Sequence, residues 1–147
     1  MKKLLILFSL FSAVAFTACD NDDNPPASAL GEAERGFIEA KYPGSVVVEV
    51  EKTYGGLLSV DVVHDSKKKD IYFKEGGEWL YTKWDILRSE LPEVAADAVL
   101  AEYDGYCIDD VDYVEASTGD CYEVDIEKGN IEKDVYVTAD GSLLNLN

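Results

Sequence analysis

Apolar residues recur at helical spacing in two stretches of the chain, residues 30–42 and residues 89–103. The first stretch ends in Tyr42-Pro43-Gly44 and the second, 61 positions later, in Tyr103-Asp104-Gly105, so each predicts a helix that stops at a tyrosine. Ser28 and Ser89 are the predicted N-caps. The predicted buried stripes are Leu30, Ala33, Phe37 and Ala40 in the first helix, and Leu91, Val94, Ala98 and Ala101 in the second.

After each helix the pattern changes to alternation of apolar and polar residues, which predicts short strands separated by glycine-containing turns. The sequences of these strands are also repeated: Asp70-Ile71-Tyr72-Phe73 resembles Asp134-Val135-Tyr136-Val137, 64 positions later. The predicted strands are residues 46–51, 58–62, 70–74 and 79–84 after the first helix, and residues 107–115, 121–127, 132–138 and 142–146 after the second.

This repetition predicts two tandem units, residues 29–86 and 87–147, each made of one helix and four strands. Strands joined by short hairpins need no crossover helix, so the sheet should be antiparallel. A unit of this size buries little apolar surface alone, so we expect the two units to share one core. The predicted fold class is therefore α+β, with one antiparallel sheet and both helices packed on one face.

The N-terminus resembles the signal segment of a bacterial lipoprotein. Lys2 and Lys3 precede an apolar run that is too short for a comfortable membrane span, and the run ends at Thr17-Ala18-Cys19. The resemblance implies a signal peptide over residues 1–18 and lipidation of Cys19; ordinary signal-peptidase cleavage is the alternative. Residues 19–28 are acidic and contain two prolines, so we expect a disordered tether, which also resembles the export tag of surface lipoproteins.

The chain carries a formal net charge of −17, from 30 acidic and 13 basic residues. Such a charge repels nucleic acids and anionic lipid surfaces, and it favours cationic or neutral partners.

The helix ending in Tyr42-Pro43-Gly44, the tyrosine-bearing third strand and the run Gly76-Gly77-Glu78-Trp79-Leu80 resemble the PepSY-like family. The resemblance covers nearly all of residues 30–146 and implies a fold like that of the beta-lactamase inhibitor protein. It also implies a small protein of the bacterial cell envelope, lipid-anchored to the outer membrane and facing the periplasm or the cell surface. The family carries no catalytic residues, so we expect no enzyme and no cofactor.

The residues that could support chemistry do not form a recognisable site. His64 is the only histidine and is expected in a solvent-exposed turn, without a nucleophile or a second metal ligand at a meaningful spacing. Carboxylates are dense in the second unit, where they form either a solvated acidic face or a calcium site. They lie at Asp109, Asp110, Asp112, Glu115, Asp120, Glu123, Asp125 and Glu127.

Cys107 and Cys121 could form a disulfide in an oxidising envelope, and the related inhibitor fold does link its early strands by disulfides. The hairpin turn at Ser117-Thr118, however, places Cys121 opposite Val114, too far along the strand from Cys107 for a bond. Both possibilities stay open from the sequence.

The most informative candidate site is aromatic. Strand alternation predicts that one set of apolar residues faces the helices, namely Ile71, Phe73, Leu80, Val135, Val137 and Leu144. Tyr72, Trp79, Tyr81 and Tyr136 should then face the other side of the sheet, where they either bind a partner or only stabilise the sheet as cross-strand pairs.

We therefore expect a non-enzymatic lipoprotein that binds a protein or peptide through this face, as an inhibitor or regulator of a secreted or envelope enzyme. A small-ligand or calcium-binding module in the acidic second unit is the alternative.

Overall fold

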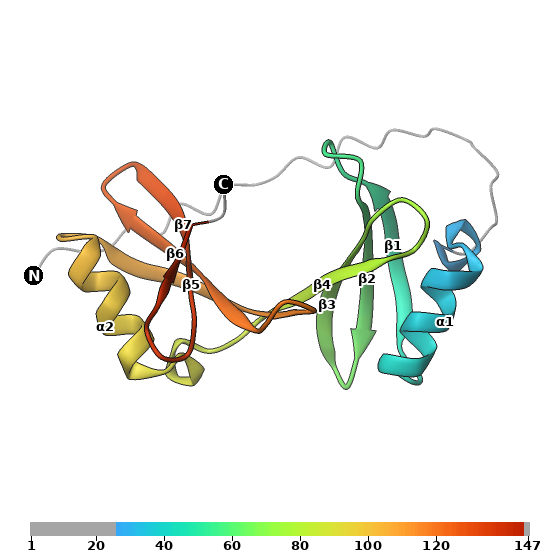
Figure 1. Ribbon diagram of the computed structural model, residues 1–147, viewed down its shortest axis with the longest axis horizontal. Helices are drawn as coiled ribbons and strands as arrows, with labels where there is room; N and C mark the ends of the chain where they lie inside the picture. Colours follow the sequence, from blue (N-terminus) through green and yellow to red (C-terminus); the bar gives the residue numbers. More distant parts are fainter. Residues whose placement is uncertain (1–25, 146–147) are drawn as a thin grey trace, which may run out of the picture.

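The computed structural model describes residues 26–145, in which a helix and four strands are followed by a second helix and four strands (Figure 1). The first half contains η1 (Pro26–Ala29), α1 (Glu32–Lys41), β1 (Val46–Lys52), β2 (Leu58–His64), β3 (Lys67–Phe73) and β4 (Trp79–Asp85). The second half contains η2 (Arg88–Glu90), α2 (Glu93–Glu102), β5 (Cys107–Ala116), β6 (Cys121–Lys128), β7 (Ile131–Val137) and β8 (Leu143–Leu144).

The strands form one eight-stranded sheet in chain order, β1 to β8, and every neighbouring pair is antiparallel. Tight turns make this order possible. Between β2 and β3 the two turn residues Asp65 and Ser66 have φ values of 50° and 63°, which suits the twist of a two-residue hairpin. The predicted α+β class with a single antiparallel sheet is confirmed.

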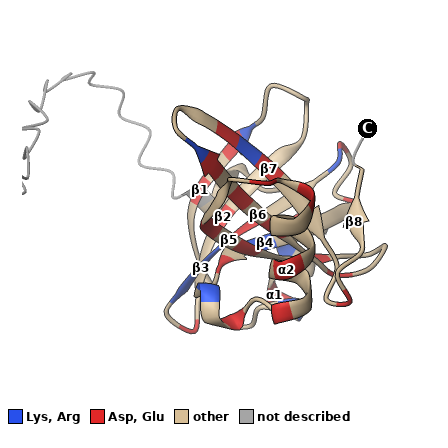
Figure 2. Ribbon diagram, turned by 90° about the vertical axis from the view of Figure 1, so that its left-hand side faces the viewer, with Lys and Arg blue, Asp and Glu red and all other residues tan. Residues whose placement is uncertain are grey.

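Both helices pack on the same face of the sheet. Ile71 of β3 lies under α1, and it is paired with Thr82 of β4, which is paired in turn with Glu115 of β5. Four positions before Glu115, and therefore on the same face, Val111 belongs to the cluster under α2. Figures 1 and 2 show α1 and α2 on one side of the strands, at the two ends of the sheet.

Each helix ends where the sequence predicts. Tyr42 and Tyr103 are the C-cap residues, and their amides donate to the carbonyls of Ile38 and Val99 at 2.8 and 3.0 Å. Gly44 and Gly105 follow with φ values of 78° and 77°, a conformation that glycine adopts without strain.

The helix starts and the buried helix faces differ from the prediction. The N-caps are Gly31 and Pro92 rather than Ser28 and Ser89, which lie in the 3-10 turns before the helices. The buried faces are Leu30, Glu34 and Ile38 in the first half, and Leu91, Ala95 and Val99 in the second.

Ala33, Ala40, Val94 and Ala101 are exposed, although they belong to the predicted stripes. The predicted stripe of α1 is wrong because the buried face contains the charged Glu34. Its carboxylate fits against Gly31 and Gly77, which have no side chains to exclude it. In α2 nearly every position is apolar, so two faces compete and the pattern cannot choose between them.

The expectation of one shared core is wrong. Two separate hydrophobic clusters lie under the two helices, one in each half of the described residues, and they have no member in common. Between them the helix side of β4 and β5 carries the polar residues Thr82 and Glu115 next to Trp84 and Tyr113. Glu115 accepts hydrogen bonds from Lys41 at 2.7 Å and from the Tyr42 hydroxyl at 3.1 Å. We call this contact the polar seam.

The predictions for the N-terminus, the signal peptide over residues 1–18 and the lipidated Cys19, lie outside the described residues. Most of the predicted tether also lies outside them, and its last three residues, 26–28, belong to the 3-10 helix η1. Within residues 26–145 no helix is both long and apolar enough to cross a membrane.

Candidate functional site

The side of the sheet opposite the helices, which we call the open face, has no element packed on it among the described residues. Strand register places alternate residues of β2 to β7 on it, because paired residues of neighbouring strands point to the same side. Its main polar and aromatic members are Asp61, Lys68, Asp70, Tyr72, Tyr81, Lys83, Asp112, Glu123, Asp125, Asp134 and Tyr136.

Trp79 does not lie on the open face, contrary to the prediction. Leu80 is a bulge: Tyr72 is paired with Tyr81, and the next residue, Phe73, is paired with Trp79. The extra residue turns Trp79 to the helix side, where its ring stacks on Phe37 at 5.2 Å between centroids. Its indole nitrogen also donates to the buried Thr82 hydroxyl at 3.0 Å, so Trp79 is part of the first core.

The other facing assignments hold except at the chain end and the bulge. Ile71, Phe73, Val135 and Val137 are buried in the two cores. Leu143 packs against the second core in place of Leu144, which lies opposite Tyr136.

Tyr72 and Tyr81 form a stacked pair on the open face, with ring centroids 4.5 Å apart and planes inclined by 25°. Both are half-buried, and burial together with the neighbouring Tyr72 hydroxyl raises the pKa of Tyr81. Tyr136 of β7 is the third tyrosine of this face, and burial and Glu123 raise its pKa. The raised pKa values keep the phenols of Tyr81 and Tyr136 protonated at neutral pH, so both can donate hydrogen bonds.

Lys83 connects the two halves across the centre of the open face. Its ammonium lies 3.2 Å from the carboxylates of both Asp112 and Glu123, which belong to β5 and β6. Burial lowers the pKa of Lys83, but the two carboxylates outweigh it and raise the pKa above its ordinary value. The lysine is therefore charged, and it neutralises the acidic residues nearest to the tyrosines.

The hairpin β2–β3 carries a pair of aspartates with their own counter-ion. Asp61 and Asp70 lie directly opposite each other. The Lys68 ammonium lies 2.7 Å from Asp61 and 3.7 Å from Asp70 and so bridges the pair. Burial and Asp61 nevertheless raise the pKa of Asp70, and its Oδ1 atom is buried without a hydrogen-bond partner among the described residues.

The hairpin β6–β7 repeats this arrangement without the counter-ion. Asp125 and Asp134 lie directly opposite each other, in the register of Asp61 and Asp70. Both are 64 positions further along the chain, and the residue 64 positions after Lys68 is Glu132. No lysine or arginine of residues 26–145 forms an ion pair with Asp125 or Asp134.

The shortage of positive charge affects Asp125 directly. Burial and the neighbouring Asp134 raise the pKa of the Asp125 carboxyl to about 6, with further contributions from Glu123, Asp110 and Asp112. Asp110 lies opposite Asp125 on β5, so three aspartates stand side by side across three strands. Like charges placed opposite each other destabilise a sheet.

A hollow of about 130 Å³ lies at this position, which we call the acidic hollow. Apart from Ile126, its lining consists of five carboxylates: Asp109, Asp125, Glu127, Glu132 and Asp134. In Figure 2 the red segments run along neighbouring strands of this half.

The two lysines of the β6–β7 hairpin lie away from the acidic hollow. Lys128 donates to the carbonyl of Asp104 at 2.9 Å, and it lies 5.5 Å from the centre of the Tyr106 ring. Lys133 lies 5.5 Å from the ring centre of Tyr103, at the end of α2. Both ammonium groups are thus held on the helix side.

The other candidates support no chemistry. His64 packs its ring on Tyr42 at 5.6 Å and is not a freely exposed turn residue. Both cysteines of the described region are free: Cys121 lies opposite Val114, as predicted, and Cys107 lies opposite Glu127. Within residues 26–145 no three His, Cys, Asp or Glu side chains are grouped so that they could hold a metal ion, so we do not propose the calcium site.

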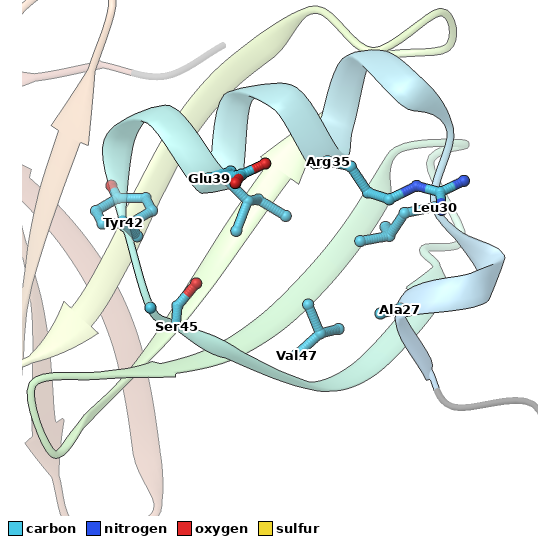
Figure 3. A pocket seen from close by; sticks show the side chains of 9 residues that line it. Ala27, Leu30, Arg35, Glu39, Tyr42, Ser45 and Val47 are labelled. Carbon is cyan, nitrogen blue, oxygen red and sulfur yellow. The ribbon is translucent and has the colours of Figure 1, made fainter.

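A second hollow, of about 320 Å³, lies between α1 and the edge strand β1 (Figure 3). Leu30, Ile38, Tyr42 and Val47 give it an apolar lining, and Arg35 and Glu39 add charge. The Arg35 side chain already donates to the carbonyl of Gly31, 3.3 Å away. Ser45 also lines this hollow, but within residues 26–145 no hydrogen bond joins its hydroxyl to Glu39 or to another base, and we assign the hollow no chemistry.

One eight-stranded antiparallel sheet with two helices on one face is a fold that this protein shares with a BLIP-like protein of known structure. Residues 58–145 match the family described as "Putative beta-lactamase-inhibitor-like, PepSY-like", and the chain belongs to this family. The resemblance found in the sequence is confirmed.

Solved structures share the fold. A BLIP-like protein of Bacteroides fragilis is 24% identical, with a TM-score of 0.64 over 83% of this chain and 85% of that one. A DUF2874 family protein of Bacteroides ovatus is 19% identical, with a TM-score of 0.65 over 84% and 86% of the two chains. A protein of Bacteroides eggerthii described as a "putative periplasmic" protein is 17% identical, with a TM-score of 0.61 over 78% and 86%. No curated protein matches the sequence.

Proposed function

We propose that the protein is a non-enzymatic component of the cell envelope that binds a protein or peptide partner through its open face. The anchors are Tyr72, Tyr81 and Tyr136, and Trp79 is no longer among them. The observation that carries the proposal is the stacked Tyr72–Tyr81 pair, which lies on β3 and β4 of the open face. Tyrosines in such positions are typical anchors of protein interfaces.

The surroundings of the tyrosines favour binding over a purely structural role. Lys83 holds Asp112 and Glu123 in fixed positions beside them, so a partner meets an ordered surface and not mobile side chains. The half-buried rings offer apolar area together with a hydroxyl donor. Cross-strand stacking stabilises the sheet as well, and both roles are compatible.

The envelope location rests on two observations that agree. The sequence contains a lipoprotein-like signal that ends at Cys19, and a structural neighbour is described as "putative periplasmic". Lipid anchoring at Cys19 to the outer membrane is part of the proposal. The BLIP-like description of another neighbour supports the finer proposal that the partner is a secreted or envelope enzyme whose activity the protein inhibits or regulates.

The test begins with crosslinking on intact cells and identification of the captured partner. The purified partner is then titrated against the wild-type protein, Tyr72→Ala/Tyr81→Ala, and the control Tyr54→Ala, which removes a fully exposed tyrosine of the β1–β2 turn. We expect the double variant to bind at least about 10-fold more weakly and the control to bind like the wild type. A folded double variant with unchanged affinity would show that the tyrosine pair is not the site.

A further inference from the structure

We propose that the acidic hollow of the β6–β7 hairpin binds an arginine or lysine side chain of the partner, in the place that Lys68 occupies in the β2–β3 hairpin. This inference rests on the proposed function, because it adds the chemistry of the partner to the open face. It assigns a binding site for one cationic side chain, next to the tyrosine anchors.

The first half of the molecule shows how such a site is filled. Its two opposed aspartates, Asp61 and Asp70, hold one ammonium group between them, with Lys68 2.7 Å from Asp61. The two hairpins match residue by residue in register: Asp61 and Asp70 correspond to Asp125 and Asp134, and Tyr72 corresponds to Tyr136. The second hairpin therefore presents the same pair of carboxylates and the same neighbouring tyrosine.

In the second half, a hollow lies beside the two aspartates, and no lysine or arginine of the described residues pairs with them. Glu132 stands where Lys68 stands in the first half, so the chain supplies an additional carboxylate in place of the cation. The lysines of this hairpin cannot compensate, because Lys128 and Lys133 are held by Asp104 and Tyr103 on the other side of the sheet. A cation that filled the hollow would therefore come from outside the described residues.

The geometry favours an organic cation over a metal ion. Five carboxylates line the hollow, but no three of them are grouped closely enough to hold a metal ion. A guanidinium group is planar and presents five N–H donors, so it can contact carboxylates on two strands at once. Tyr136, which lies two residues from Asp134 on the same face, would contact the aliphatic part of the side chain.

The proposal predicts that a lysine built into the hairpin would fill the site from within. In Glu132→Lys, the new ammonium should bridge Asp125 and Asp134 as Lys68 bridges Asp61 and Asp70. The pKa of Asp125, followed by NMR titration, should then fall from about 6 toward its ordinary value of 3.8. An unchanged Asp125 pKa would contradict the proposed equivalence of the two hairpins.

The binding test uses acetylated pentaarginine amide as the probe, titrated into the full protein while amide shifts are recorded by NMR. We expect the largest shifts at Asp125, Glu132 and Asp134, and an affinity about 10-fold lower in Glu132→Lys than in the wild type. The control Glu39→Lys makes the same change of charge on the exposed surface of α1 and should weaken binding no more than about 2-fold. If both variants lost the same affinity for the peptide, binding would reflect only the net negative charge of the protein, and the proposal would be overturned.

Two further arms keep the outcome clear. If Glu132→Lys does not fold, Asp134→Asn against Glu39→Gln gives the same comparison with neutral side chains. If 1 mM calcium chloride shifts the same amides more than the peptide does, the hollow is a metal site and the proposal fails. Tyr72→Ala/Tyr81→Ala leaves the hollow intact and should bind the peptide normally, so a failure of the tyrosine anchors is distinguishable from a failure of the cation site.

Discussion

The β2–β3 and β6–β7 hairpins have the same register and opposite electrostatics. In each, two aspartates face each other on the open face, 64 positions apart between the halves. One pair is bridged by Lys68, whereas the other stands beside Glu132 and has no ion-pair partner among the described residues. The same strand register therefore forms with and without a bridging lysine. Because opposed like charges destabilise a sheet, the second hairpin carries an arrangement that stability alone does not favour.

The cores of the two halves give the largest expected effect. Phe73 and Val137 occupy equivalent strand positions, and both are completely buried. We expect Phe73→Ala to lower the free energy of unfolding by about 3–5 kcal/mol and Val137→Ala by about 2 kcal/mol, because the larger side chain leaves the larger cavity. Urea unfolding followed by tryptophan fluorescence and by circular dichroism measures both.

The same experiment tests whether the two halves unfold together. Because the cores share no residue, Phe73→Ala should leave the second half folded at urea concentrations that already unfold the first, so unfolding should show two transitions. A single unfolding transition in this variant would show that the pairing of β4 with β5 is enough to make the two halves unfold together.

Reversing the charge of the first hairpin is expected to have a smaller effect. Lys68→Glu should make this hairpin resemble the second one and lower the free energy of unfolding by about 1 kcal/mol at pH 7, since Asp61 and Asp70 lose their bridge. Lys67→Glu provides a matched control on the neighbouring exposed residue, which forms no ion pair among residues 26–145. An equal loss in the control would trace the effect to net charge.

The pH dependence of stability tests the second hairpin, through Asp125. The folded pKa of Asp125 is raised to about 6 from 3.8, so the folded state holds more protons than the unfolded state between these values. Stability contributed by this group should therefore fall as pH rises from about 4 to about 6. Asp125→Asn should raise the free energy of unfolding at pH 7 by about 1 kcal/mol or less, because the side chain is exposed and solvent screens it.

At pH 4 the same substitution should have little effect, because both Asp125 and its replacement are then largely uncharged in the folded protein. Thermal melts of the wild type and the variant at the two pH values measure the difference. A stabilisation of equal size at pH 4 would indicate that the change acts through packing and not through charge.

The sequence predicted the strands, the turns and the helix ends because these features are local. Tyr42-Pro43-Gly44 ends a helix through its own backbone, and the strand alternation is visible wherever pairing is regular. Trp79 was misplaced because a bulge at Leu80 changes the alternation, and the bulge depends on pairing with β3. The helix faces were misjudged because alanines carry little directional information and because Glu34 is buried.

The candidate site was only partly visible in the sequence. Strand alternation predicts that Tyr72, Tyr81 and Tyr136 share one face, and residues 134–137 visibly repeat the pattern of residues 70–73. When this alignment is extended two residues toward the N-terminus, Lys68 aligns with Glu132. This replacement of a lysine by a glutamate is the feature of the sequence that indicates the acidic hollow. Its meaning depends on the opposition of Asp125 and Asp134, which only the register of β6 and β7 reveals.

The polar seam bears on how such a protein can change over time. No apolar side chain of one core has to fit a side chain of the other, so a substitution under either helix can be accommodated within its own half. The hydrogen-bonded ladder between β4 and β5 keeps the halves joined whatever their side chains are. A scaffold with two separate cores lets one half retain a self-contained surface while the other acquires a new specificity.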